Sequence, residues 1–246
     1  MFKIYDVIIP VGIGCTVSYH LKKNGIRECS LPFDWLYGIT IEKAIKLIEN
    51  SFQDFLDKDS LEFSYVCGPH DVYSNTKLSI NFVHDFSSSR AHETKSKDDV
   101  FNQTLMEVKN KYARRINRLY NLLSSKKRVL LMHYFDGSAP ESFEFLEENR
   151  LKFCKLYPNL RIDIIYIYTQ NCLIKKYKKI NKHIYLIPMP IPSNLSEENR
   201  WMGNSKQFKI LLKKFTTKNK LKTRILKCLK LKKNKKMFVD HNFFND

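Results

Sequence analysis

The stretch Tyr5-Asp6-Val7-Ile8-Ile9-Pro10-Val11-Gly12-Ile13-Gly14-Cys15 decides how this chain folds. Residues 5–11 are mostly apolar and β-branched, which is typical of a buried strand. Two glycines and a cysteine follow, and residues 16–23 have the composition of a helix that Asn24-Gly25 would end. The stretch therefore predicts a strand, a sharp turn and a helix, with Cys15 at the turn.

Further along the chain, predicted strands alternate with longer predicted helices. Apolar runs predict strands at residues 61–66, 78–83, 128–132, 160–168 and 183–188. Apolar residues at helical spacing predict helices at residues 40–56, 98–123 and 141–156. This alternation is typical of an α/β domain with a mostly parallel central sheet and helices on both faces. We expect that domain over residues 1–203, followed by a basic amphipathic helical tail over residues 204–246.

The composition indicates a globular protein. Hydrophobic residues make up 43% of the 246 residues, which excludes global disorder, and the longest apolar runs are too short to span a bilayer. The first ten residues show no secretory signal, which favours the cytoplasm. The six cysteines have neither CxxC spacing nor histidines at zinc spacing, so we expect no metal site and no disulfide framework.

The positive charge is concentrated toward the C-terminus. The formal net charge is +18, and fourteen of the 43 lysines and arginines lie in residues 206–236, which contain no acid. The other 29 cations and the 25 acids leave the rest of the chain at +4.

Apolar residues recur at helical spacing among the lysines of residues 206–236, first at Phe208, Leu211, Leu212 and Phe215. The pattern predicts a helix on an anionic membrane surface, at the inner face of the membrane. Nucleic-acid binding, for which interleaved aromatic residues are missing, and a solubilising tail are the alternatives.

Cys15 has the predicted setting of a nucleophile. The unpaired N–H groups and the helix dipole at the first turn of a helix favour a thiolate, so we expect a pKa below the usual value of about 8.5. Gly12 and Gly14 would let a substrate approach, Phe33 and Trp35 would wall its pocket, and nearby N–H groups would stabilise an oxyanion. The alternatives are a buried structural cysteine and a phosphate-binding turn. The latter is weak, because neither a third glycine nor a P-loop lysine follows.

A nucleophilic cysteine needs a base. His84, after a predicted strand, is the base that we favour, and His133 is the reserve. A carboxylate on the far nitrogen would orient the imidazole. Asp85 is adjacent to His84 and would point to the other side of the strand, so we favour Asp34 for this role.

Three motifs carry a resemblance to a known family. They are Gly12-Ile13-Gly14-Cys15, Pro32-Phe33-Asp34-Trp35 and His84-Asp85-Phe86, in this order. Over residues 3–171 the chain resembles a bacterial and viral family of domains labelled papain-like cysteine peptidases. The resemblance implies Cys15 as the nucleophile and His84 as the base, in the Cys-before-His order of papain-like enzymes. The sequence departs from the family pattern at His133, where an arginine is expected, and has no papain-type local signature around Cys15.

The resemblance leaves two reactions open. A distantly similar group of capsule-polysaccharide enzymes looks like acyltransferases that use coenzyme A, and family members tend to sit near surface-polysaccharide and glycosyltransferase functions. Acyl transfer to a carbohydrate acceptor is therefore an alternative to hydrolysis of a peptide, and coenzyme A is expected only for that alternative. A non-catalytic binding or glycosyltransferase-accessory module at the membrane surface is the alternative outside the enzymes.

Overall fold

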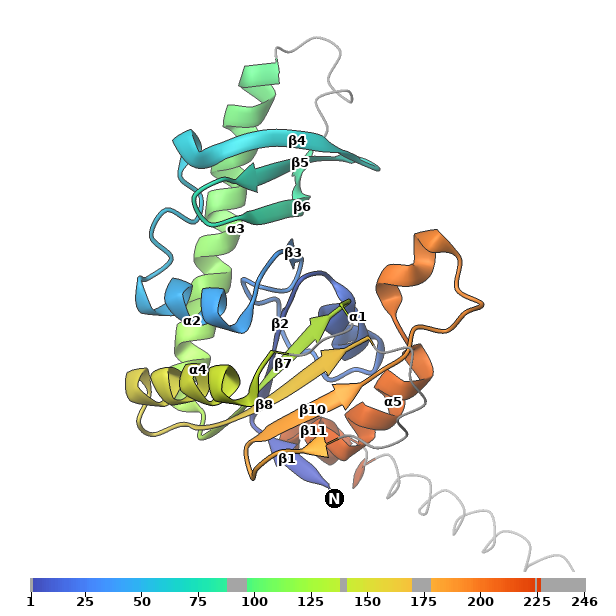
Figure 1. The fold of residues 1–246 in the computed structure, drawn as a ribbon. Helices are drawn as coiled ribbons and strands as arrows, with labels where there is room; N and C mark the ends of the chain where they lie inside the picture. The colour runs from blue at the N-terminus through green and yellow to red at the C-terminus, as the bar shows by residue number, and fades with distance from the viewer. Residues whose placement is uncertain (1, 88–96, 138–140, 170–177, 224, 227–246) are drawn as a thin grey trace, which may run out of the picture.

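The central sheet has five strands in the order β2-β7-β8-β10-β9 (Figure 1). The computed structural model describes residues 2–87, 97–137, 141–169, 178–223 and 225–226. The strands are β2 (Val7–Gly12), β7 (Arg128–Phe135), β8 (Arg161–Tyr168), β10 (Ile184–Pro188) and β9 (Lys178–Lys179). The first four pair in parallel, and β9 pairs antiparallel with β10. The predicted α/β class with a mostly parallel central sheet is confirmed.

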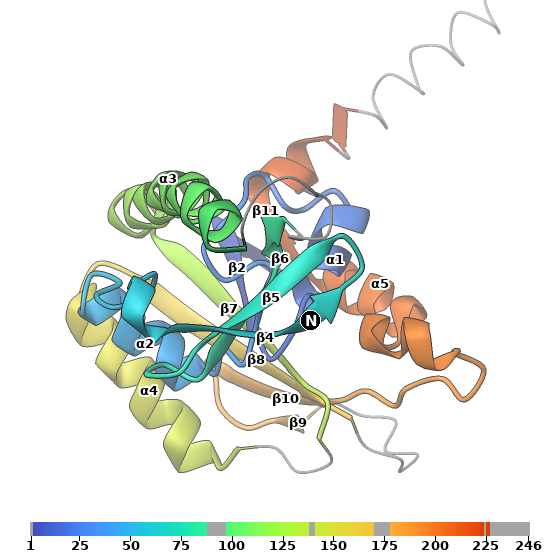
Figure 2. The ribbon, with the colours of Figure 1, turned by 90° about the horizontal axis from the view of Figure 1, so that it is seen from above.

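Helices cover both faces of this sheet, as Figure 2 shows from above. The helices are α2 (Ile41–Glu49) and α4 (Phe143–Leu156) on one face, and α1 (Thr16–Lys23) and α5 (Ser205–Lys214) on the other. Side chains along β7 alternate between the two faces, as the pleat of a strand requires. Leu131 packs into the core on the α2 and α4 side, whereas Met132 packs into the core on the α1 and α5 side. Two apolar cores therefore enclose the sheet.

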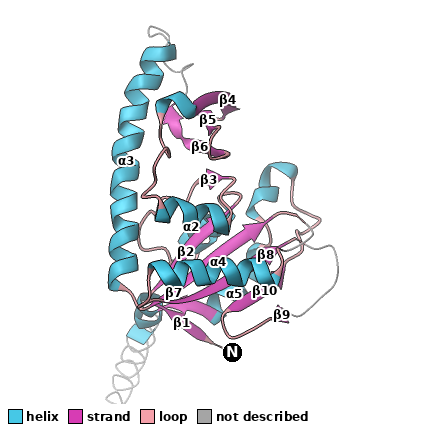
Figure 3. Ribbon diagram, turned by 60° about the vertical axis from the view of Figure 1, so that its left-hand side comes forward, coloured by secondary structure: helices cyan, strands magenta, loops and turns pink. Residues whose placement is uncertain are grey.

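A second, antiparallel sheet lies over the end of β2. Its order is β3-β6-β5-β4, and its strands are β3 (Leu36–Tyr37), β4 (Leu61–Cys67), which follows η1 (Lys58–Ser60), β5 (His70–Asn75) and β6 (Ile80–Ser87). The long helix α3 (Lys97–Ser125) runs along this sheet and past the central one (Figures 1 and 3). The sequence predicted strands here but not a separate sheet. The connections between β4, β5 and β6 are so short that these strands can pair only as antiparallel hairpins.

The segment after residue 203 belongs to the fold. Phe208, Leu212 and Phe215 are buried in the second core. The strand β11 (Phe215–Thr217) pairs in parallel with β1 (Lys3–Tyr5). The predicted end of the domain after residue 203 is therefore wrong. The first part of the apolar stripe that we assigned to a membrane surface, Phe208 to Phe215, packs into the core beside β10 and α1 instead. No helix in the described residues is long and apolar enough to cross a membrane. Of the predicted tail, residues 224 and 227–246 lie outside the described residues.

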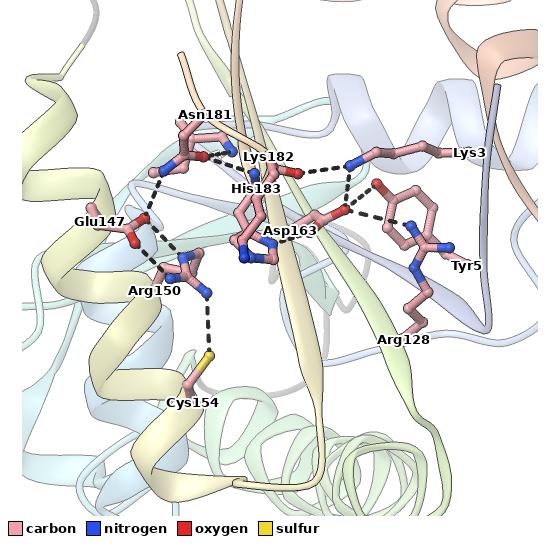
Figure 4. Close-up of polar contacts among 11 residues, drawn as sticks. Lys3, Tyr5, Arg128, Glu147, Arg150, Cys154, Asp163, Asn181, Lys182 and His183 are labelled. Carbon is pink, nitrogen blue, oxygen red and sulfur yellow. Dashed lines mark hydrogen bonds and ion pairs between the residues drawn. The ribbon is translucent and has the colours of Figure 1, made fainter. Parts of the chain in front are cut away.

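A buried charge cluster attaches β1 to β8 (Figure 4). The carboxylate of Asp163, which is fully buried, accepts hydrogen bonds from Lys3 Nζ at 2.9 Å and from the Tyr5 hydroxyl at 2.7 Å. Its other oxygen lies 2.7 Å from His183 Nδ1. Burial alone would raise the pKa of Asp163, but the bonds from Lys3, His183 and Tyr5 outweigh it and hold that pKa below its usual value.

Candidate active site

The structure brings Cys15 and His84 together. Cys15 follows β2 directly and occupies the N-cap of α1. His84 projects from β6, which continues beyond it to Ser87, so the histidine lies within a strand rather than after one. The Cys15 Sγ atom lies 3.3 Å from His84 Nε2. Two residues 69 positions apart in sequence thus form a thiol–imidazole pair with a hydrogen bond between them.

The surroundings of the pair favour the neutral form of each group. Burial, followed by the nearby charges of Asp85, Cys67 and Asp34, raises the pKa of Cys15 to about 12. Burial also lowers the pKa of His84, and the neighbouring His70 lowers it further. The prediction of a Cys15 thiolate with a lowered pKa is therefore wrong, because burial and two carboxylates oppose the charge. At neutral pH, His84 must take the proton when the sulfur attacks.

Asp34 does not orient His84 by a direct bond. Its carboxylate accepts hydrogen bonds from the Arg27 guanidinium and from the Leu31 N–H at 3.0 Å. The guanidinium carbon of Arg27 lies 5.2 Å from the centre of the Trp35 ring. Trp35 in turn meets the imidazole of His84 edge to face. Asp34 therefore forms hydrogen bonds within its own loop. It is connected to His84 only indirectly, because Arg27 contacts Trp35 and Trp35 contacts the His84 ring.

Asp85, the alternative acid, is directed toward α3. One carboxylate oxygen accepts the Tyr112 hydroxyl at 2.7 Å, and the other lies 2.6 Å from Lys111 Nζ. Those partners make Asp85 an anchor of β6 on α3. In the described part of the chain, neither predicted carboxylate is bonded to His84.

His133, the reserve base, lies inside the core. It is 2% exposed and stacks on Tyr166, with 4.6 Å between the ring centroids. Burial lowers its pKa to about 3. Since β7 runs on to Phe135, the residue lies before the end of the strand and does not line the cavity of Cys15. The prediction that His133 could serve as a base is wrong, because no substrate can reach it.

A second histidine, which the sequence analysis missed, lies beside the base. The His70 ring stands 5.8 Å from the His84 ring at 89°. His70 Nδ1 lies 3.3 Å from the Phe86 carbonyl oxygen, which can only accept, so Nδ1 carries the hydrogen. The Gly68-Pro69 turn could have revealed this neighbour, because a two-residue hairpin turn places Cys67 opposite His70 and returns the chain toward β6.

A cavity of about 1620 Å³ opens at the Cys15–His84 pair. Gly14 and Trp35 line it, as predicted for substrate-contacting residues. The other two residues predicted to contact the substrate do not line it. A Cβ atom on Gly12 would lie 3.1 Å from the Tyr134 carbonyl oxygen, so this glycine permits close packing of β2 on β7. Phe33 is 2% exposed and belongs to the first core.

A further wall of the cavity comes from residues 191–201, which include most of η3 (Glu197–Met202). Two bonds hold this wall on α1. Thr16 Oγ1 donates to the Trp201 carbonyl oxygen at 2.6 Å, and His20 Nε2 lies 2.7 Å from the carbonyl oxygen of Met202. The sequence analysis did not predict this wall, because its residues follow no regular period. Among the described residues, no group of three or more His, Cys, Asp or Glu side chains could hold a metal ion.

Comparisons with known proteins place most of this chain in a known family. A family model described as "Putative papain-like cysteine peptidase (DUF1796)" matches residues 6–168. "Uncharacterized protein R408" of Acanthamoeba polyphaga mimivirus is 31% identical over 142 residues, which cover 51% of this chain and 60% of that protein. No solved structure matches the chain significantly. The family match includes Cys15, Trp35 and His84, whereas the wall at residues 191–201 lies beyond it. The chain belongs to the DUF1796 family, which this model describes.

Proposed function

We propose that the protein is a cysteine hydrolase that cleaves an acyl bond, with a peptide as its substrate. The observation that carries the proposal is the 3.3 Å contact between Cys15 Sγ and His84 Nε2, two residues that line an open cavity. A thiol within hydrogen-bond reach of a neutral imidazole is the arrangement that base-assisted nucleophilic attack requires.

In the first step, the Cys15 sulfur forms a bond to the carbonyl carbon while its proton moves to His84 Nε2. The carbonyl oxygen becomes an oxyanion, to which we assign the first-turn N–H groups of α1, since Cys15 supplies no side-chain cap to them. The carbon–nitrogen bond then breaks, and the amine leaves with the proton from His84. In the second step, water attacks the thioester with His84 again as the base. The acid leaves, and the Cys15 thiol is restored.

The test is formation of an acyl-enzyme. The protein is mixed with p-nitrophenyl acetate, and the modified residue is located by mass spectrometry. We expect an acetyl group on Cys15, no adduct there in Cys15→Ala, and acylation about 100-fold slower in His84→Ala. The control is Cys67→Ser, which removes the other thiol of the cavity and should leave the rate unchanged. An adduct on Cys67 alone, or an unchanged rate in His84→Ala, would overturn the proposal and favour a non-catalytic binding module.

Acyl transfer to a carbohydrate is the second candidate. Exposed aromatic side chains border the cavity, with Tyr37, Tyr65 and Trp201 each 46–49% exposed. Such faces suit an acceptor with an apolar side and polar edges. With an acyl-coenzyme A donor and a sugar acceptor, transfer would yield an acylated sugar faster than free acid. If free acid is the only product at saturating acceptor, the hydrolase assignment stands.

A further inference from the structure

We propose that the cavity binds a carboxylate of the substrate at Arg115 of α3. This inference rests on the proposed function, because it concerns the acyl group that is presented to Cys15. Arg115 lines the same cavity as Cys15 and His84, although its own side chain is only 11% exposed.

Arg115 holds an unused hydrogen-bond donor. Its Nη1 atom is buried and has no hydrogen-bond partner among the described residues. The nearest carboxylate oxygen, Oδ1 of Asp85, is 3.8 Å away, which is too far for a hydrogen bond. A buried donor without a partner costs free energy, and an incoming acceptor would remove that cost.

The charges around Arg115 leave one cation in excess. Asp85 has a nearer partner in Lys111, at 2.6 Å, and Asp34 forms its ion pair with Arg27. Lys111 and Arg27 thus already balance the two carboxylates, and Arg115 is a third positive charge beside them. An anionic group beside Arg115 would complete the balance, and burial of the guanidinium would strengthen its attraction.

The ligand chemistry follows from the guanidinium and from the other charges of the cavity lining. A planar guanidinium binds a carboxylate through two parallel hydrogen bonds. Elsewhere in the lining, Asp136, Glu197 and Glu198 outnumber Arg200 and would repel an anion. The substrate that fits is an acyl group with a carboxylate near its reacting carbonyl, directed toward α3.

The experiment compares two small reagents that alkylate the same sulfur. Iodoacetate carries a carboxylate, and iodoacetamide is its neutral counterpart. The rates at Cys15 are measured by peptide mapping of the full chain, and 2-mercaptoethanol, a neutral thiol free in solution, is the reference. We expect the iodoacetate to iodoacetamide rate ratio to be about tenfold higher at Cys15 than for the free thiol. Arg115→Gln should remove this preference, and Arg115→Lys should keep part of it.

The matched control is Arg118→Gln, on the same helix but outside the cavity lining, where Arg118 Nη1 contacts the Ser30 carbonyl oxygen at 3.5 Å. It should leave the ratio unchanged. Equal ratios at Cys15 and at the free thiol would overturn the inference, as would a parallel loss of both rates in Arg115→Gln with no rescue by Arg115→Lys. If Cys15 reacts with neither reagent, the proposed function fails and this inference fails with it. A reactive Cys15 without charge preference overturns only the inference.

Discussion

The imidazole of His84 and the indole of Trp35 meet edge to face, with ring centroids 6.0 Å apart and an angle of 86° between their planes. The same indole contacts the guanidinium of Arg27, which Asp34 holds in place. The Pro32-Phe33-Asp34-Trp35 motif therefore sets the position of the base through an aromatic ring. Asp34, the acid of this motif, affects His84 only through Arg27 and Trp35 and touches neither reacting atom.

Asp34→Asn should mainly destabilise the fold. The substitution leaves Arg27 without its buried partner, which costs about 3 kcal/mol in the free energy of unfolding, measured in urea. We expect the folded fraction to acylate Cys15 more slowly than wild type, but much faster than His84→Ala does. A triad acid would behave in the opposite way, with a rate loss of about 10⁴ and unchanged stability.

Trp35→Leu should slow the acylation of Cys15 about tenfold, because it removes the ring that restrains the His84 imidazole. Trp35→Phe keeps an aromatic edge and should restore most of the rate. Acylation by p-nitrophenyl acetate at several concentrations separates a loss of the limiting rate, which we expect, from a loss of binding. Equal rates in the Leu and Phe variants would contradict a positioning role.

The pH dependence of Cys15 modification should reflect a neutral pair. His84 acts as a base only when it is unprotonated, and its pKa is lowered, so acylation should persist at pH 6.5 and fall only at more acidic pH. The pKa of Cys15 is raised to about 12, so its reaction with iodoacetamide should keep increasing well above pH 8.5, where an ordinary thiol levels off. A rate that is already constant between pH 6 and 9 would indicate a preformed thiolate–imidazolium pair instead.

Shortened chains should separate the fold from the basic segment. A chain that ends at residue 203 loses the buried Phe208, Leu212 and Phe215, together with the strand that pairs with β1, and should lose its cooperative thermal transition. A chain that ends at residue 217 should keep that transition. Circular dichroism at increasing temperature compares the two, and a cooperative transition in the shorter chain would show that the second core closes without α5.

For residues 218–236, which carry ten of the fourteen cations, we propose an anionic membrane surface as the partner. The full chain should sediment with vesicles that contain phosphatidylserine but not with neutral ones, and added salt should weaken this binding. The chain that ends at residue 217 should remain in the supernatant. Retention of that chain on the vesicles would place the binding surface elsewhere, and preference for a nucleic acid would favour the alternative partner.

Apolar periodicity and local glycines predicted the central sheet and the turn at Cys15. His84 was predicted as the partner of Cys15 from its place beside a strand and from the family resemblance, although that strand continues past it to Ser87. The sequence could not predict what Asp34 binds, since the pattern does not reveal that Arg27 is closer than the base. His133 was misplaced because a strand buried on both faces can enclose a polar residue without a break in its pattern. The residues around Phe208 were misassigned, because the same helical spacing suits a membrane surface and a protein core.

The pairing of Lys3 with Phe215 has a consequence for synthesis on the ribosome. The strand β1 emerges long before β11, and the Asp163 cluster that holds it needs His183, which also emerges late. Most of the first core, around α2, α3 and α4, precedes these segments in the sequence and can begin to assemble on the nascent chain, and Ile184 joins it later. The core on the α1 side forms later, and so does the wall at residues 191–201 that Thr16 and His20 hold. A nascent chain therefore carries Cys15 for a time without the last segment that lines its cavity.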